Sequence, residues 1–124
     1  MAAILTTRGG AFRDLKNLPQ ARACANRALK LQPESHYSHN LLGAISFQSG
    51  KPEAGEHHFE LAITYGAKPK EQDSLLRSAI EQSSEKNQSM VAKYLLQKDP
   101  KRYRWAEPYL HIQKQPKGNP ETKN

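Results

Sequence analysis

Residues 21–29 read ARACANRAL, and their apolar side chains recur at every third or fourth position. This spacing places them on one side of an α-helix, as an amphipathic helix requires. The face consists of Ala21, Cys24, Ala25, Ala28 and Leu29. When this pattern is shifted along the chain so that Ala21 is aligned with Gly55, its other positions fall on His58, Phe59, Ala62 and Ile63. The return of this face at a fixed offset indicates an internal repeat.

Each repeat divides into two predicted helices. The pairs span 3–15 with 19–31, 36–48 with 52–65 and, with weaker periodicity, 71–83 with 88–98. Pro19 stands in the first turn of its helix, where its missing N–H is harmless. Ser35 can cap the helix after it, and Gly50 supplies the left-handed residue that ends a helix. Pro69 is interpreted as the end of the second unit, and the apolar face of the third comes about two residues early.

The composition favours a single all-α domain. Ala, Leu, Lys, Gln and Glu are frequent and form helices well, and no segment alternates as a strand does. A chain of 124 residues with 36% hydrophobic residues can build one thin core. We expect a domain over 1–112, with repeats over 2–35, 36–69 and 70–103 and a capping segment that continues to residue 112. Residues 113–124 are expected to be a disordered basic tail.

Two sets of motif residues point to a known family. The second repeat has His39-x2-Leu42-Gly43-x2-Ser46, then Gly55-x3-Phe59. The first has Leu5-x2-Arg8-Gly9-x2-Phe12, then Ala21-x3-Ala25 and Pro33. This arrangement resembles the tetratricopeptide (TPR) family, whose 34-residue unit reads W-x2-L-G-x2-Y, A-x3-F and P. The resemblance implies a right-handed α-solenoid of about three antiparallel helix pairs, the third degenerate, whose paired helices approach closely at the small residues.

The resemblance also implies a concave groove, lined by the first helix of each pair, that holds a partner peptide or helix. Its predicted binding residues are Arg13, Tyr37, Asn40, Leu41, Phe47 and Gln48. The same face includes Ala3, Thr6, Thr7, Gly10 and Asp14 before them, Ala44 among them, and Glu71, Ser74, Leu75, Ser78, Glu81 and Gln82 after them. Aromatic rings would anchor the ligand and the amide would bond to its backbone. For Phe47, packing between helices of neighbouring repeats is an equal alternative.

The lysine, asparagine and arginine clamp with which some TPR domains capture chaperone carboxylates is absent at these positions. The expected function is therefore a non-catalytic interaction module or scaffold for another protein. An exposed solenoid end is a further surface, suited to self-association.

The basic C-terminal region supplies a second hypothesis. Of the net charge of +7, residues 1–67 carry +2 and residues 68–124 carry +5. Lys101, Arg102, Tyr103 and Arg104 interleave cations with an aromatic ring, as nucleic-acid-binding segments do. Trp105 after the last repeat instead favours a cap over its apolar end, packed against Tyr94 or Leu95, so nucleic-acid binding is the less favoured interpretation.

No catalytic or metal-binding signature occurs in the sequence. A P-loop, GxSxG and HExxH are all absent, and the histidine pairs lack the further ligands that zinc requires. We expect no enzyme activity, no cofactor and no metal. Cys24 is the single cysteine, so no internal disulfide can form. Without an apolar run of ~18–20 residues or a signal-peptide pattern, no membrane association and a cytoplasmic location are expected.

Overall fold

The computed structural model describes residues 1–110, and every regular element in that range is a helix. The elements are α1 (Ala2–Asp14), α2 (Leu18–Leu31), α3 (His36–Gln48), α4 (Pro52–Thr64), α5 (Pro69–Glu81), α6 (Glu85–Lys98) and the short 3₁₀ helix η1 (Arg104–Tyr109). The all-α prediction is confirmed over this range. The predicted tail, 113–124, and the last two residues of the predicted cap lie outside the described residues.

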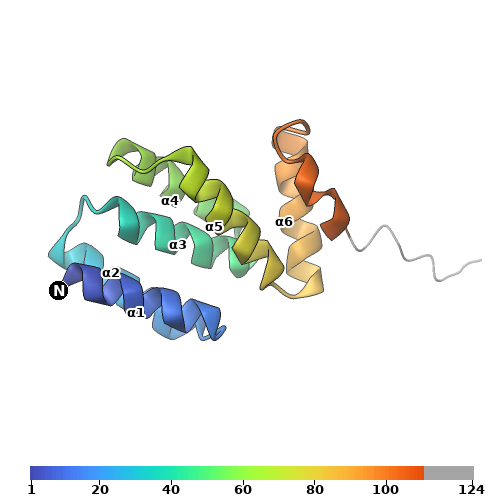
Figure 1. Cartoon of the computed structure of the whole chain (residues 1–124). Helices are drawn as coiled ribbons and strands as arrows, with labels where there is room; N and C mark the ends of the chain where they lie inside the picture. The colour runs from blue at the N-terminus through green and yellow to red at the C-terminus, as the bar shows by residue number, and fades with distance from the viewer. Residues whose placement is uncertain (111–124) are drawn as a thin grey trace, which may run out of the picture.

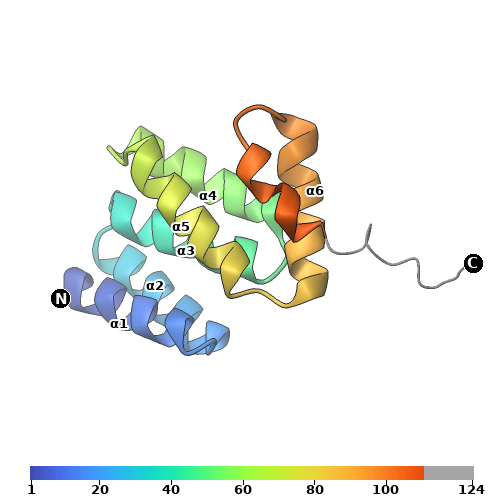
Figure 2. The same cartoon turned by 45° about the vertical axis from the view of Figure 1, so that its right-hand side comes forward.

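The first four helices form two antiparallel pairs, α1 with α2 and α3 with α4 (Figure 1). Helices α1, α3 and α5 lie side by side, and α2 and α4 lie behind them (Figure 2). Helix α3 is the central element, since every residue of 38–48 is buried. It contacts all four of its neighbours, α1, α2, α4 and α5.

Two reciprocal glycine–phenylalanine contacts hold α3 against α4. The Phe59 ring of α4 occupies the space where a Cβ at Gly43 of α3 would stand. The Phe47 ring of α3 lies 2.5 Å from the equivalent Cβ position at Gly55 of α4. The ring centroids are 5.3 Å apart and the planes are tilted by 50°. Each glycine leaves room for a ring of the partner helix, which confirms the close approach expected at these two positions.

The turns inside the first two pairs share one backbone geometry, although only the second contains a glycine. Gly50 has a φ of 79° and donates its N–H to the Phe47 carbonyl at 3.0 Å. Lys16, at the equivalent position of the first pair, has a φ of 63° and donates to the Arg13 carbonyl at 2.9 Å. In both turns the next N–H bonds to the carbonyl five positions back, at 2.8 Å. This left-handed helix ending suits glycine and strains lysine.

The third pair differs from the first two in register and in packing. Helix α5 begins at Pro69 and α6 at Glu85, two and three residues before their predicted starts. Pro69 opens a helix instead of only ending a unit, because a proline fits the first helical turn. Ser84 caps α6 by accepting a bond from the Asn87 N–H at 3.2 Å. Helix α6 crosses α5 at a steep angle (Figures 1 and 2), so this pair lacks the antiparallel packing predicted for it.

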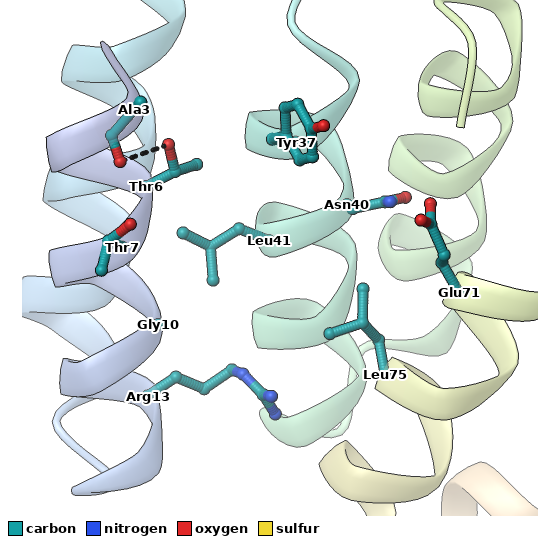
Figure 3. Close-up of a pocket in the computed structure, with 10 residues that line it drawn as sticks. All are labelled: Ala3, Thr6, Thr7, Gly10, Arg13, Tyr37, Asn40, Leu41, Glu71 and Leu75. Atoms are coloured by element: carbon teal, nitrogen blue, oxygen red, sulfur yellow. Dashed lines mark hydrogen bonds between the residues drawn. The ribbon is translucent and has the colours of Figure 1, made fainter. Parts of the chain in front are cut away.

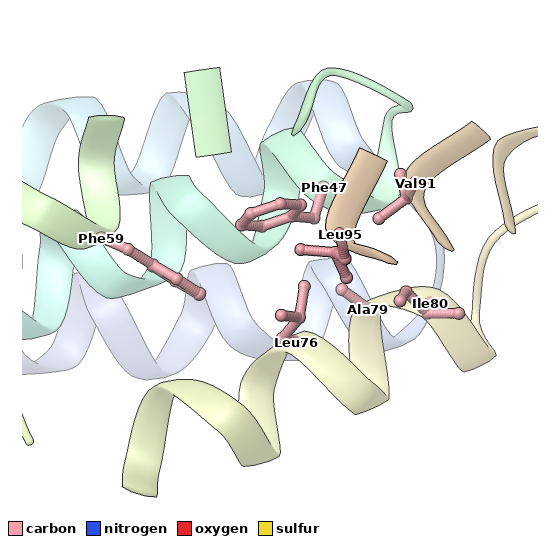
Figure 4. Packing of buried hydrophobic residues seen from close by; sticks show 7 residues of the cluster. All are labelled: Phe47, Phe59, Leu76, Ala79, Ile80, Val91 and Leu95. Atoms are coloured by element: carbon pink, nitrogen blue, oxygen red, sulfur yellow. The ribbon is translucent and has the colours of Figure 1, made fainter. Parts of the chain in front are cut away.

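Helix η1 lies along α6, in the wedge between α5 and α6 (Figure 2). Trp105 is half-buried there, and the Arg77 guanidinium of α5 lies 4.7 Å from the centre of its ring. The Ser89 hydroxyl of α6 donates to the Tyr109 carbonyl at 3.3 Å. The segment covers an apolar cluster (Figure 4) formed by Phe47, Phe59, Leu76, Ala79, Ile80, Val91 and Leu95. Residues 104–110 therefore pack in the wedge between α5 and α6 and against this cluster.

Candidate functional site

A recess of about 650 Å³ opens between α1, α3 and α5 (Figure 3). Its lining residues are Ala3, Thr6, Thr7, Gly10 and Arg13 of α1, Tyr37, Asn40 and Leu41 of α3, and Glu71 and Leu75 of α5. All of them stand on the helix faces that the sequence assigned to a concave groove. We call this recess the groove.

Of the six predicted binding residues, four line the groove and two do not. Arg13, Tyr37, Asn40 and Leu41 are at its surface. Phe47 is only 2% exposed and belongs to the apolar cluster, because Gly55 leaves room for its ring toward α4. Gln48 is also buried, at the end of α3. The assignment of Phe47 and Gln48 to the groove surface is therefore corrected. Phe47 packs in the core, but against Gly55 and Phe59 of α4 as well as the α5 residues of the cluster, and not only between α3 and its neighbour α5.

The groove combines an apolar floor with an exposed aromatic rim. Leu41 is buried on the floor and Leu75 is half-buried beside it. Tyr37 stands at one end of the groove and is 66% exposed. The centre of its ring lies 4.0 Å from the centre of the His36 ring. Such an aromatic side chain can cover an apolar ligand group without losing much rotamer freedom.

Asn40 is held in place by α5. Its Oδ1 accepts a hydrogen bond from Gln72 Nε2 at 2.9 Å, and the same Nε2 donates to the Phe59 carbonyl at 2.9 Å. Gln72 is buried and does not face the groove. The amide oxygen of Asn40 is engaged by Gln72, whereas no bond to another described residue uses its Nδ2, which can donate to a ligand carbonyl.

Arg13 lies at the opposite end of the groove from Tyr37 and extends from α1 toward α3 (Figure 3). Its side chain is buried, with 6% exposed. Nη1 donates to Gln48 Oε1 at 2.9 Å and Nη2 to Ser78 Oγ at 3.4 Å, whereas Nε is enclosed without an acceptor. Burial lowers the pKa of the Arg13 guanidinium, and the Asp14 carboxylate opposes this shift only in part.

A polar network around Arg13 closes this end of the groove. Gln48 Nε2 donates back to the Arg13 carbonyl at 3.4 Å. Gln82 Nε2 donates to Ser78 Oγ at 3.0 Å and to Asp14 Oδ1 at 3.4 Å. The network thereby connects α1, α3 and α5. Ser78 and Gln82 were predicted to lie on the groove face, but no local sequence pattern indicated that they would lie beside Arg13.

The predicted nucleic-acid segment, 101–104, is partly used in packing. Arg102 Nη2 forms an ion pair with Asp73 Oδ1 at 3.1 Å, and its guanidinium lies 5.0 Å from the centre of the Tyr103 ring. Tyr103 is half-buried against the apolar cluster and meets Trp105 edge-on, with centroids 6.2 Å apart. Lys101 and Arg104 are exposed. The structure therefore leaves two of the three cations without a role in packing.

A histidine cluster lies between α3 and α4. The His39 ring stacks on Tyr65 and His58, at centroid distances of 5.5 and 6.2 Å. The Nδ1 atoms of His39 and His58 are buried without a hydrogen-bond partner. Burial lowers the pKa of His58, and the positive charges of His39, His57 and Arg22 add to the shift. Within residues 1–110, no group of three or more His, Cys, Asp or Glu side chains is placed to hold a metal ion.

The longest helices, α2 and α6, have 14 residues each, whereas a bilayer requires about 20. No helix within the described part of the chain is long and apolar enough to cross a membrane. No family model, no curated protein and no solved structure matches this chain. The geometry of the groove is therefore the basis on which a function is inferred.

Proposed function

We propose that this chain is a non-catalytic interaction module of the TPR type, a scaffold that holds a partner peptide or helix in the groove. The observation that carries the proposal is the origin of the lining residues. They all come from α1, α3 and α5, which stand at equivalent positions of the repeat. A recess built by successive units of a helical array is the usual binding surface of such proteins.

The repetition of backbone detail supports a TPR-like solenoid. Helices α1, α3 and α5 begin at Ala2, His36 and Pro69, so the successive units are almost equal in length. The turns at Lys16 and Gly50 share their hydrogen bonds, and α3 and α4 interlock at two glycines that occupy positions of the TPR pattern. The steep crossing of α6 suits a degenerate terminal unit of such an array.

The groove fits a short peptide segment with at least one large apolar side chain. Leu41 and Leu75 provide the surface against which that side chain would pack, and Tyr37 would close over it from the rim. The Nδ2 of Asn40 would donate to a peptide carbonyl. Large apolar side chains seated in such a recess usually dominate the affinity of a peptide complex.

The test selects ligands from a displayed library of short random peptides on the full-length chain. The affinities of the selected peptides are then measured by fluorescence polarisation. Tyr37→Ala should weaken binding by at least ~1 kcal/mol, about fivefold or more. Because Tyr37 is largely exposed, the melting temperature should hardly change. Met90→Ala, at a 41% exposed side chain of α6, is the matched control and should bind as the wild type does. Selected peptides whose affinity is unchanged by Tyr37→Ala would contradict the proposed site.

The alternative, nucleic-acid binding through 101–104, has weaker support. Arg102 is paired with Asp73, and Tyr103 packs against the apolar cluster, where its ring cannot stack freely on a base. We assign this segment to the attachment of η1 and α6 to α5.

A further inference from the structure

The charge state of Arg13 indicates what kind of ligand the groove takes. The ion pairs among residues 1–110 are Lys98 with Glu56 and Arg102 with Asp73, so Arg13 has no carboxylate partner. Of the five N–H groups of a guanidinium, only two donate to other described residues, both to neutral oxygens. The nearest candidate, Asp14, accepts from Gln82 instead.

A buried guanidinium without a counter-ion is unfavourable. Arginine is almost never fully buried unless it is paired, because the desolvation of its charge is expensive. The carbonyl ends of α1, α3 and α5 lie near Arg13 and supply part of the missing negative charge. Burial nevertheless lowers the pKa of Arg13, and its Nε is enclosed without an acceptor. The site therefore favours an added anion.

We propose that the peptide held in the groove places a carboxylate on Arg13, at a fixed spacing from the apolar side chain that packs on Leu41 and Leu75. This inference rests on the proposed function and defines the class of partner: a segment that combines an acidic and a large apolar residue. Nε is enclosed, so the carboxylate would bind Nη1 and Nη2, which use only two of their four N–H groups on Gln48 and Ser78. Charge-assisted bonds of this kind are about twice as strong as neutral ones.

The charges of the groove also give the ligand a direction. Glu71 lies near the Tyr37 end and Arg13 lies at the other end, with Leu41 between them (Figure 3). A carboxylate beside Glu71 would be repelled. The acidic end of the peptide should therefore lie at Arg13, and neutral or basic residues should lie near Glu71.

The experiment uses the peptides selected on the full-length chain. They are joined to the display protein at their C-termini, so only Asp or Glu side chains can supply a carboxylate near Arg13. We expect Asp or Glu at a constant spacing from a Leu, Ile, Met or Phe. Changing that Glu to Gln in the peptide should lower the affinity for the wild type about tenfold to a hundredfold. For binding to the Arg13→Gln variant, the same change in the peptide should alter the affinity less than twofold.

Controls separate charge from folding. Arg8→Gln removes the same charge from an exposed position of α1 outside the groove and should leave the peptide preference intact. Arg13→Lys keeps the charge without the fork of donors and should give an intermediate loss; it also keeps the test decisive if Arg13→Gln does not fold. Free-acid and amide forms of short leucine peptides distinguish a C-terminal carboxylate from a side-chain carboxylate as the group bound.

The outcomes separate the two proposals. Peptides that are sensitive to Tyr37→Ala but show no acidic preference would overturn the Arg13 inference and leave the proposed function standing. An equal effect of the Glu to Gln change on wild type, Arg13→Gln and Arg13→Lys would also overturn it. If no selected peptide responds to Tyr37→Ala, the proposed function itself fails.

Discussion

Adding one methyl group at Gly43 tests the close contact between α3 and α4. In Gly43→Ala the new Cβ would overlap the Phe59 ring and would lie 3.1 Å from the Gly55 carbonyl oxygen. Phe59 cannot turn away freely, because the Phe47 ring lies against it and is itself seated on Gly55. Overpacking of a core costs about 1–3 kcal/mol, and with both rings confined we expect about 2–3 kcal/mol. The better helix propensity of alanine returns about 1 kcal/mol, which leaves a net loss of about 1–2 kcal/mol.

The assay is urea unfolding followed by circular dichroism, in which such a loss lowers the midpoint without changing the slope. In thermal unfolding it corresponds to a decrease of about 5–10 °C. Gly10→Ala is the matched control, since nothing lies within 4 Å of its Cβ position. It should be stabilising by up to about 1 kcal/mol. The cost of Gly43→Ala should also shrink in a Phe59→Leu background. A Gly43→Ala protein as stable as Gly10→Ala would refute the reasoning.

Two further predictions concern the first turn and the histidine cluster. Lys16→Gly should raise the free energy of unfolding by about 0.5 kcal/mol, since relief of the left-handed strain outweighs the added entropy of the unfolded chain. The control is Lys51→Gly, at a negative φ, which should bring no gain in the same urea titration. His58 has a folded-state pKa below its usual 6.5, so the unfolded chain binds more protons and stability should fall as the pH drops below about 6.5. His58→Gln should flatten this dependence in melts between pH 5 and 8, whereas the exposed His57→Gln should retain it; an unchanged slope in both would contradict the burial of His58.

The groove face was predictable because helical periodicity fixes which residues share a face once the repeat offset is known. The repeat offset related the groove-face positions of α3 to those of α1. The lining residues of both helices lie on these predicted faces. The same rule failed for Phe47 and Gln48, which are buried away from the groove surface. Phe47 and Arg13 occupy equivalent positions, yet the ring turns toward α4 while the guanidinium stays beside the groove. The difference depends on Gly55, whose counterpart in the first pair is Ala21, and on polar partners from α3 and α5.

The third pair was less predictable because its geometry depends on distant parts of the chain. Pro69 fits either the end of one unit or the start of the next helix, and the sequence alone does not distinguish these roles. The crossing of α6 over α5 goes together with the η1 segment, whose Trp105 packs between them. No periodic pattern within α5 or α6 encodes this wedge. The burial of Arg13 was likewise not predictable, because its acceptors, Gln48 and Ser78, come from two other helices.

The bonds that join α1 directly to α5 change how the protein can come apart. In a linear array each unit touches only its neighbours, so the terminal units can fray one at a time. Here Asp14 bonds to Gln82, and Arg13 bonds to Ser78, across the intervening unit. Detaching the first pair would strip partners from the third as well as from α3. The opening of either outer helix is thereby coupled to the other, and the chain is expected to lose its structure in one cooperative step.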